Sequence, residues 1–261
     1  MPDLPASIAA RFRLDGRVAV VTGASKGIGE AIARGLAEFG ATVVVSSRMQ
    51  DAVDAIAEAL RADGFDAHAL ACHVGDVEAI YGFVDEVVET HGGIDIVVNN
   101  AATNPVFGPV EATDGRAFDK IVDVNLRGPF ELCKRALPSM RARGGGSIIN
   151  IASIGGLTPE AGLGIYSVSK AALVSLTAVM AKEWGADGIR ANAICPGFIQ
   201  TKFSRVLWQN DAVMDELTTQ LPLGRIGQPE EMAGLAVFLA SDAASYCTGG
   251  VFLADGGYLL I

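Results

Sequence analysis

The chain has few cysteines, few aromatic residues and a deficit of basic residues. Of its 261 residues only 4 are cysteine and 7% are aromatic, and 30 acidic against 20 basic side chains give a formal net charge of −10. Cys72, Cys133, Cys195 and Cys247 lack the close spacing of a metal site, so we expect reduced core thiols, no metal and no disulfide framework. The acidic balance disfavours a nucleic-acid partner, which needs basic patches.

Membrane and export signals are also lacking. Half of the residues are hydrophobic, yet no uninterrupted apolar run approaches the roughly 20 residues that a membrane span needs. The opening Met-Pro-Asp-Leu-Pro lacks the basic start and apolar stretch of a signal peptide. The final Tyr-Leu-Leu-Ile differs from a peroxisomal Ser-Lys-Leu address. We therefore expect a cytoplasmic protein without a membrane partner.

The chain does contain a regular alternation of strand-like and helix-like segments. Short β-branched runs predict strands at 17–22, 41–47, 66–72, 94–99, 146–152, 189–195 and 250–254. Helical spacing predicts helices at 28–39, 50–63, 76–91, 117–142, 165–186 and 229–240. This alternation predicts an α/β fold, a doubly wound parallel (Rossmann) sheet of about seven strands with helices on both faces. No linker interrupts it, so we expect a single domain over 1–261.

A glycine-rich turn follows the first predicted strand. Gly23, Gly27 and Gly29 stand between that strand and the first long helix, in Thr22-Gly-Ala-Ser-Lys-Gly-Ile-Gly29. This order brings backbone N–H groups and a helix N-terminus to a diphosphate. The spacing differs from the G-x-G-x-x-G of many dehydrogenases. It predicts a dinucleotide site, with an ordinary strand-to-helix turn as the alternative.

Tyr166 and Lys170 lie four positions apart in a predicted helix, thirteen and more residues after Ser153. Positions i and i+4 share a helix face, so the lysine ammonium can lie close to the phenol and favour phenolate. That would move a group with a pKa of about 10 towards the range of an acid/base catalyst. The spacing alone also fits amphipathic patterning.

Taken together, these motifs resemble the short-chain dehydrogenase/reductase family. The likeness extends roughly from residue 14 to residue 258 and also includes Asn99-Asn100-Ala101-Ala, Asn125 and Pro196-Gly197. Some shorter segments resemble more closely the NADPH-dependent carbonyl and retinol reductases of animal peroxisomes. These segments are Val-Val-Val-Ser-Ser-Arg48, Cys-His-Val-Gly75, Asn-Ala-Ala-Thr-Asn-Pro-Val-Phe-Gly108 and Phe-Ser-Arg-Val-Leu-Trp208.

The resemblance implies the catalytic residues. A carbonyl group needs a hydride, which the coenzyme supplies, and a proton. Tyr166 would donate or accept that proton, Lys170 would lower the tyrosine pKa and bind the nicotinamide ribose, and Ser153 would polarise the carbonyl. Asn125 would hold a water molecule that connects Lys170 to solvent. The alternative for Asn125 is a buried amide that only bridges backbone groups.

Charge after the second predicted strand favours NADP(H) over NAD(H). Many NAD-binding units have an acid there, whereas this strand ends Ser46-Ser47-Arg48 and the glycine turn adds Lys26. Such cations suit a 2′-phosphate, and solvated surface charges are the alternative. The expected coenzyme contacts are Gly23, Ser25, Lys26, Gly27, Ile28, Gly29, Ser47, Arg48, His73, Val74, Asn100, Ala101, Tyr166, Lys170, Pro196, Gly197, Ile199 and Thr201.

The expected substrate is a small carbonyl or alcohol compound. By family likeness, residues 202–221 would cover the pocket, and an apolar cover and walls favour a lipophilic or aromatic ketone. The apolar candidates are Phe203, Val206, Leu207, Trp208, Val213, Met214 and Leu217 in the cover and Val106, Phe107, Leu157 and Ile165 in the walls. Packing onto the core or onto a second subunit is the alternative.

Three functions remain in competition. An NADP-dependent carbonyl reductase is favoured. A reductase of 3-oxoacyl thioesters of acyl carrier protein or CoA is the alternative, and its carrier would need basic residues such as Arg127, Lys134 and Arg205. A non-catalytic dinucleotide sensor is disfavoured by the complete set of catalytic residues.

Apolar residues on several faces of two helices predict a homo-oligomer. They are Phe130, Leu132, Leu173, Leu176 and Met180, and the C-terminal strand and tail are also apolar. The family likeness makes the expected assembly a homotetramer.

Overall fold

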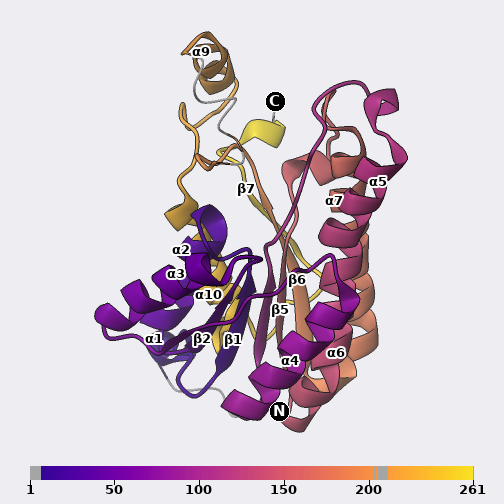
Figure 1. The fold of residues 1–261 in the computed structure, drawn as a ribbon. Helices are drawn as coiled ribbons and strands as arrows, with labels where there is room; N and C mark the ends of the chain where they lie inside the picture. Colours follow the sequence, from indigo (N-terminus) through magenta and orange to yellow (C-terminus); the bar gives the residue numbers. More distant parts are fainter. Residues whose placement is uncertain (1–6, 203, 205–210, 261) are drawn as a thin grey trace.

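A single parallel sheet organises the molecule (Figure 1). The structure is a computed structural model that describes residues 7–202, 204 and 211–260. Its seven strands follow the order β3-β2-β1-β4-β5-β6-β7, and each neighbouring pair is parallel. The strands are β1 (Val18–Thr22), β2 (Thr42–Ser46), β3 (Ala67–Ala69), β4 (Ile96–Asn99), β5 (Gly146–Ile151), β6 (Ile189–Pro196) and β7 (Val251–Ala254). The predicted doubly wound fold is confirmed.

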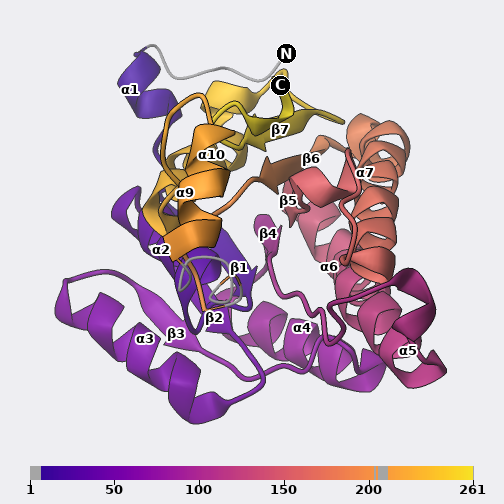
Figure 2. The ribbon, with the colours of Figure 1, turned by 90° about the horizontal axis from the view of Figure 1, so that it is seen from above.

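Helices cover both faces of the sheet (Figure 2). One face carries α2 (Gly27–Glu38), α3 (Gln50–Ala62) and α10 (Ala233–Ala240). The other carries α4 (Val77–His91), α6 (Gly128–Ala142) and α7 (Gly164–Trp184). The further helical elements are α1 (Ile8–Arg11), α5 (Gly115–Val122), α9 (Asp211–Thr219), the π-helical turn η2 (Asp123–Arg127), and the short 3-10 helices η1 (Val110–Ala112), η3 (Ile154–Gly156), η4 (Gly185–Asp187), η5 (Pro229–Met232), η6 (Asp242–Ala244) and η7 (Tyr258–Leu260).

The β-branched run in β1 is explained by burial on both faces of the sheet. Ala19 and Val21 belong to the core beneath α2, whereas Val18 and Val20 belong to the core beneath α4. Successive side chains of a strand point to opposite faces, and a strand buried on both sides has no polar positions to alternate with. The sequence pattern therefore indicates a central strand.

The helix expected at 117–142 is in fact divided. α5 ends at Val122, η2 follows, and α6 begins at Gly128. A Cβ atom on Gly128 would lie 2.2 Å from the carbonyl oxygen of Val74, so this close approach requires glycine. Asn125, within the π-helical turn, is completely buried. Such turns often occur at functional sites.

One helix is long and apolar enough to cross a membrane, although the sequence led us to expect no such segment. Residues Gly164–Asp187 are long and apolar enough, by length and composition only, to cross a membrane. In the structure 44% of that window is buried, and the helix carries the buried ammonium of Lys170. The core helix of a soluble protein passes the same test, so the observation is weak evidence for a membrane span.

The order of the strands determines where a ligand can bind. β1 pairs with β2 on one side and with β4 on the other, so the connections that leave these strands diverge. In a doubly wound sheet a crevice opens at this switch point, outside the carboxyl ends of the strands. The glycine turn begins at that end of β1.

Candidate active site

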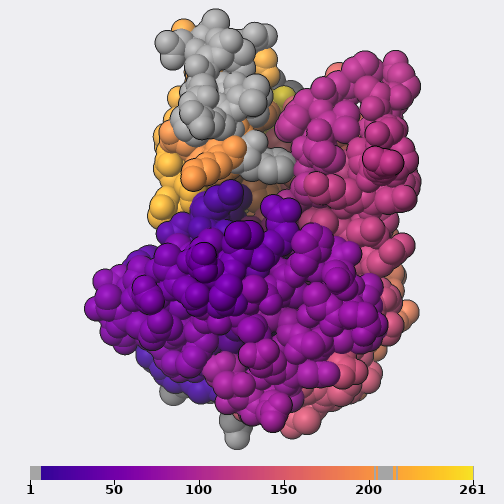
Figure 3. All heavy atoms as spheres, viewed as in Figure 1, coloured from indigo at the N-terminus to yellow at the C-terminus, as the bar shows by residue number. Residues whose placement is uncertain are grey.

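A cleft of about 730 Å³ lies at the carboxyl end of the sheet. In the space-filling view the surface is hollowed between the orange part, which includes α9, and the magenta part, which includes α5 (Figure 3). Ser153, Tyr166 and Lys170 line the cleft together with all the predicted coenzyme contacts except Gly29. Gly29 and Asn125 are buried behind the wall. The volume lies within the range of small-molecule and cofactor sites.

The glycine turn is tied to the end of β4. Asn100 donates from its amide nitrogen to the carbonyl oxygens of Thr22 and Gly23 at 2.9 and 3.1 Å. The hydroxyl of Thr22 accepts from the backbone N–H groups of Asn100 and Ala101 at 3.1 and 3.2 Å. Both amide hydrogens of Asn100 are therefore used to position the turn, and its amide oxygen remains for a ligand.

The charge of the cleft is opposite to that of the whole chain. Among the described residues that line it, Glu160 is the only carboxylate, whereas the cations are Lys26, Arg48, Lys120, Lys170 and Lys202. In a chain of net charge −10, such a local excess of cations favours an anionic ligand. The residues present thus fit the phosphates of a dinucleotide.

The end of β2 supplies the predicted 2′-phosphate residues. Ser47 and Arg48 line the cleft, Arg48 is exposed, and within the described part of the chain it has no carboxylate partner. His73 and Val74 line the same region, and His73 Nδ1 accepts from the backbone N–H of Gly75 at 3.2 Å. Among the described residues that line this region, none is a carboxylate that could bond a ribose 2′-hydroxyl.

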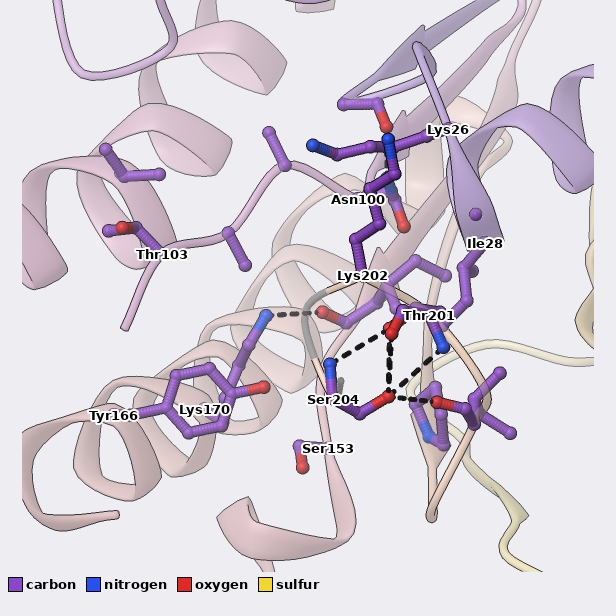
Figure 4. A pocket seen from close by; sticks show the side chains of 18 of the residues that line it. Lys26, Ile28, Asn100, Thr103, Ser153, Tyr166, Lys170, Thr201, Lys202 and Ser204 are labelled. Carbon is purple, nitrogen blue, oxygen red and sulfur yellow. Dashed lines mark hydrogen bonds between the residues drawn. The ribbon is translucent and has the colours of Figure 1, made fainter. Parts of the chain in front are cut away.

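Three catalytic candidates meet at the carboxyl end of β5. Ser153 is the N-cap of η3, where its hydroxyl accepts from the backbone N–H of Gly155 at 3.1 Å. Tyr166 and Lys170 lie in the first turns of α7 (Figure 4). Lys170 Nζ donates to the carbonyl oxygen of Ile151 at 2.7 Å and lies 5.8 Å from the centroid of the Tyr166 ring. The ammonium therefore ties α7 to β5.

The pKa of Tyr166 is shifted in the direction opposite to our expectation. Burial raises it to about 12, and the hydrogen bond with the Ser153 side chain offsets only part of this shift. Burial lowers the pKa of Lys170 to about 8. Lys170 is not a cause of this shift, because its ammonium points to a backbone carbonyl and desolvation dominates. That Lys170 lowers the tyrosine pKa in the working site stays a prediction.

Asn125 connects three segments around the site. Its amide nitrogen donates to the carbonyl oxygen of Thr103 and to the hydroxyl of Ser169, both at 3.0 Å. Its amide oxygen accepts from the N–H of Thr103 at 2.8 Å. Ser169 in turn donates to the carbonyl oxygen of Tyr166 at 2.6 Å. The bridging alternative thus describes this geometry, and the amide oxygen keeps one lone pair for the predicted water.

Several residues of the cleft were not predicted as coenzyme contacts, although two of them, Lys202 and Ser204, fall in the predicted substrate cover at 202–221. Lys202 and Ser204 follow Thr201, and the Ser204 hydroxyl lies 3.1 Å from both the N–H and the hydroxyl of Thr201. The short polar run Gln200-Thr201-Lys202, which begins three residues after Gly197, was the available signal. The other unpredicted lining residues are Met49, Ala52, Cys72, Ala102, Thr103, Lys120, Val124, Ile151, Ala152, Ile154, Gly155, Glu160, Leu163 and Phe198.

Only one of the four apolar residues predicted for the pocket walls lines the cleft. Phe107 lines the cleft, whereas Val106, Leu157 and Ile165 do not. Of the predicted cover, Met214 and Leu217 are half-buried but do not line the cleft. Phe203, Val206, Leu207, Trp208 and the side chain of Val213 lie outside the described residues. Among the described residues, no group of His, Cys, Asp or Glu side chains could hold a metal ion.

The fold and this cleft define a dinucleotide-binding oxidoreductase. A family model described as Enoyl-(Acyl carrier protein) reductase matches residues 23–259. Dehydrogenase/reductase SDR family member 4 of Oryctolagus cuniculus is 45% identical over 247 residues, 95% of each chain, and its Homo sapiens counterpart is 42% identical over 95% of this chain and 89% of its own. The chain belongs to the short-chain dehydrogenase/reductase family.

Solved structures agree with this membership. A gluconate 5-dehydrogenase from Burkholderia cenocepacia, in complex with NADP and tartrate, has a TM-score of 0.94 and 36% identity over 98% of this chain and all of its own. A short-chain type dehydrogenase/reductase from Mycobacterium marinum has a TM-score of 0.90 and 38% identity over 97% of this chain and 99% of its own.

Proposed function

We propose that the protein is an NADP-dependent carbonyl reductase that also catalyses the reverse alcohol oxidation. The observation that carries the proposal is one cleft with Ser153, Tyr166 and Lys170 on one wall and Lys26 and Arg48 on another. The named NADP complex of a similar protein supports the choice of coenzyme. The glycine turn, the cationic lining and the missing carboxylate after β2 fit NADP(H) better than NAD(H).

When bound, the coenzyme supplies or accepts the hydride. Ser153 holds the substrate oxygen by a hydrogen bond at the position where charge develops. Tyr166 donates its phenolic proton to that oxygen during reduction and accepts it during oxidation. Because burial raises the pKa of this phenol to about 12, a phenolate at the site needs a nearby cation. Lys170 supplies that cation once its ammonium turns from the Ile151 carbonyl to the bound molecules.

Removal of the Tyr166 hydroxyl tests the proton donor. Tyr166→Phe keeps the ring but not the proton, so kcat for ketone reduction should fall by orders of magnitude while the Kd for NADPH stays within a few-fold. Tyr246→Phe is the matched control, because Tyr246 is fully exposed at 102% and lies far from the catalytic residues in sequence. Full activity of Tyr166→Phe would contradict the assignment.

The second candidate is reduction of a 3-oxoacyl thioester. The description of the matching family model favours it. Its expected carrier contacts do not: Arg127 pairs with Asp123 at 2.7 Å and Lys134 pairs with Glu131 at 3.1 Å, and Arg205 lies outside the described residues.

The substrate proposal is a lipophilic or aromatic ketone. Apolar side chains of Phe107, Ile154, Leu163 and Phe198 line the cleft and support it. NADPH consumption measured with diketones, aromatic ketones, retinal and acetoacetyl thioesters separates the two functions. A kcat/KM highest for the thioester would reverse the order of the candidates. No oxidation of NADPH or NADH with any of them would favour the non-catalytic sensor.

Substitutions of Arg48 test whether the protein prefers NADPH to NADH. Arg48→Ala removes a charge-assisted contact worth about 1.5–3 kcal/mol, so the Kd for NADPH should rise by about one to two decades, while that for NADH changes little. Arg48→Asp should move the preference towards NADH by repelling the phosphate. If the parent protein already prefers NADH, or if both coenzymes lose equally, the NADP assignment is wrong.

A cytoplasmic homotetramer completes the proposal. Leu132, Leu173 and Met180, which belong to the apolar residues that predicted an oligomer, are buried within the protomer. Exposed apolar side chains do lie on α6, α7 and the edge strand β7, namely Phe130, Val168, Val179, Val251 and Leu253, and they support an assembly. Light scattering at micromolar concentration should give four times the 27.0 kDa chain mass, and a monomer mass would contradict it. Cell fractionation tests the location.

A further inference from the structure

Two lysines enter the cleft from different segments of the chain. Lys26 is the N-cap of α2 in the glycine turn, and Lys202 lies in the loop after β6. Both side chains are exposed and both line the cleft. In Figure 4 the Lys202 side chain extends away from Ser153 and Tyr166 and towards the region that Lys26 enters. Lys202 is therefore a cation of the coenzyme half of the cleft.

The glycine turn and the loop after β6 lie side by side at Gly27 and Thr201. A Cβ atom on Gly27 would lie 3.4 Å from Cγ2 and 3.7 Å from Cβ of Thr201. Gly27 follows Lys26 and Thr201 precedes Lys202, so the two lysines flank this contact. Ser204 fixes the same loop, because its hydroxyl bonds with Thr201 and with the carbonyl oxygen of Ile199.

Among the described residues, neither ammonium group has a protein counter-ion. Within the described ranges, no carboxylate forms an ion pair with either lysine, and the cleft's one carboxylate, Glu160, belongs to the loop before α7. Like charges that converge repel one another unless an anion lies between them. A ligand with adjacent negative groups, such as a diphosphate, suits this arrangement.

We infer that Lys202 is a ligand of the coenzyme diphosphate and reaches the phosphate site from the loop after β6, beside the glycine turn. This inference rests on the proposed dinucleotide function. We assign Lys202 to the diphosphate and not to the 2′-phosphate because Gly27 and Thr201 meet at the start of α2. A Rossmann fold binds the diphosphate at this helix N-terminus. Arg48 and Ser47, at the end of β2, correspond to the adenosine 2′-phosphate instead.

The diphosphate is common to NADPH and NADH, so the inference makes a sharp prediction. Lys202→Met, which keeps most of the side-chain length, should raise the Kd of both coenzymes by a similar factor of about ten, or 1.4 kcal/mol. Lys202→Arg should restore most of the affinity. Arg48→Ala, in contrast, should weaken NADPH alone. Binding is measured by coenzyme fluorescence and by calorimetry, so that no substrate is needed.

Lys182→Met is the matched control, because Lys182 is an exposed lysine of α7 outside the cleft, and both of its coenzyme Kd values should equal those of the parent. Circular dichroism and the Tm should show that all variants fold. A Kd within twofold of the parent for both coenzymes in Lys202→Met would overturn the inference. Loss for NADPH alone would also overturn it, by assigning Lys202 to the 2′-phosphate. A parent protein that binds neither coenzyme would instead contradict the proposed function.

Discussion

Replacement of Gly29 by alanine tests how closely the coenzyme turn is packed. A Cβ atom at this position would lie 2.4 Å from Asn100 Nδ2, 2.5 Å from the carbonyl oxygen of Gly23 and 2.9 Å from its carbonyl carbon. Two of these atoms are backbone, and the third already donates to Thr22 and Gly23. None can move away without breaking the bonds that hold the turn.

The net effect is a balance of two terms. Overpacking costs about 3 kcal/mol where backbone must shift, whereas alanine in the helix gains about 1 kcal/mol over glycine. We therefore expect Gly29→Ala to lower the free energy of unfolding by about 2 kcal/mol and to weaken NADPH binding. Urea unfolding followed by circular dichroism gives the first value, and coenzyme fluorescence gives the second.

Gly82→Ala is the matched control for this prediction. Gly82 lies within α4 and a Cβ atom there would meet nothing within 4 Å, so the same change should stabilise the protein by about 1 kcal/mol and leave binding unaltered. If Gly29→Ala unfolds at the parent's urea concentration and binds NADPH as well as the parent does, the steric reasoning is refuted.

The remaining predictions concern buried charges. Asp95→Ala should cost about 3–5 kcal/mol in urea unfolding, because Asp95 accepts from Arg143 at 2.7 and 2.9 Å and from the N–H of Val18 at 2.8 Å; a loss below 1 kcal/mol would contradict this. Burial lowers the pKa of Lys170 from 10.5 to about 8, so the unfolded chain binds more protons between these values. The parent should therefore gain about 3 kcal/mol of stability relative to Lys170→Met as pH rises through that window, and a constant difference would refute the shift. Burial and then His68 lower the pKa of His91, so the parent should lose stability as pH falls below 6.5, and His91→Gln should reduce that loss in melting curves.

Local patterns predicted the elements of the fold because they depend on neighbours in the chain. The β-branched run before Gly23 and the helical spacing after it recur in the structure within one or two residues. The division of the helix at 117–142 could not be predicted this way. At the start of α6, Gly128 packs against the carbonyl group of Val74, a position far away in the sequence that local spacing does not reveal.

The sequence predicted which residues form the site better than it predicted how their side chains are arranged. Motif spacing brought Ser153, Tyr166 and Lys170 into one cleft, but the hydrogen bond of Lys170 to the Ile151 carbonyl is a choice of rotamer that spacing does not determine. Lys202 was predicted as part of the substrate cover at 202–221, and not as a coenzyme contact, for a related reason. Its position beside the glycine turn follows from the path of the loop after β6, and the polar run that contains it does not show which of its side chains faces a phosphate.

The strand order also governs how the protein can fold during synthesis. The central strand β1 pairs with β4, where Ala19 lies opposite Ile96, and the cleft draws residues from Gly23 to Ser204. Most of the chain must therefore emerge from the ribosome before the coenzyme can stabilise it. Until then, the valine-rich edge of β1 lacks a partner on one side, and such long-range parallel pairing is slow and prone to aggregation. Expression at low temperature should consequently raise the soluble yield more than added coenzyme does.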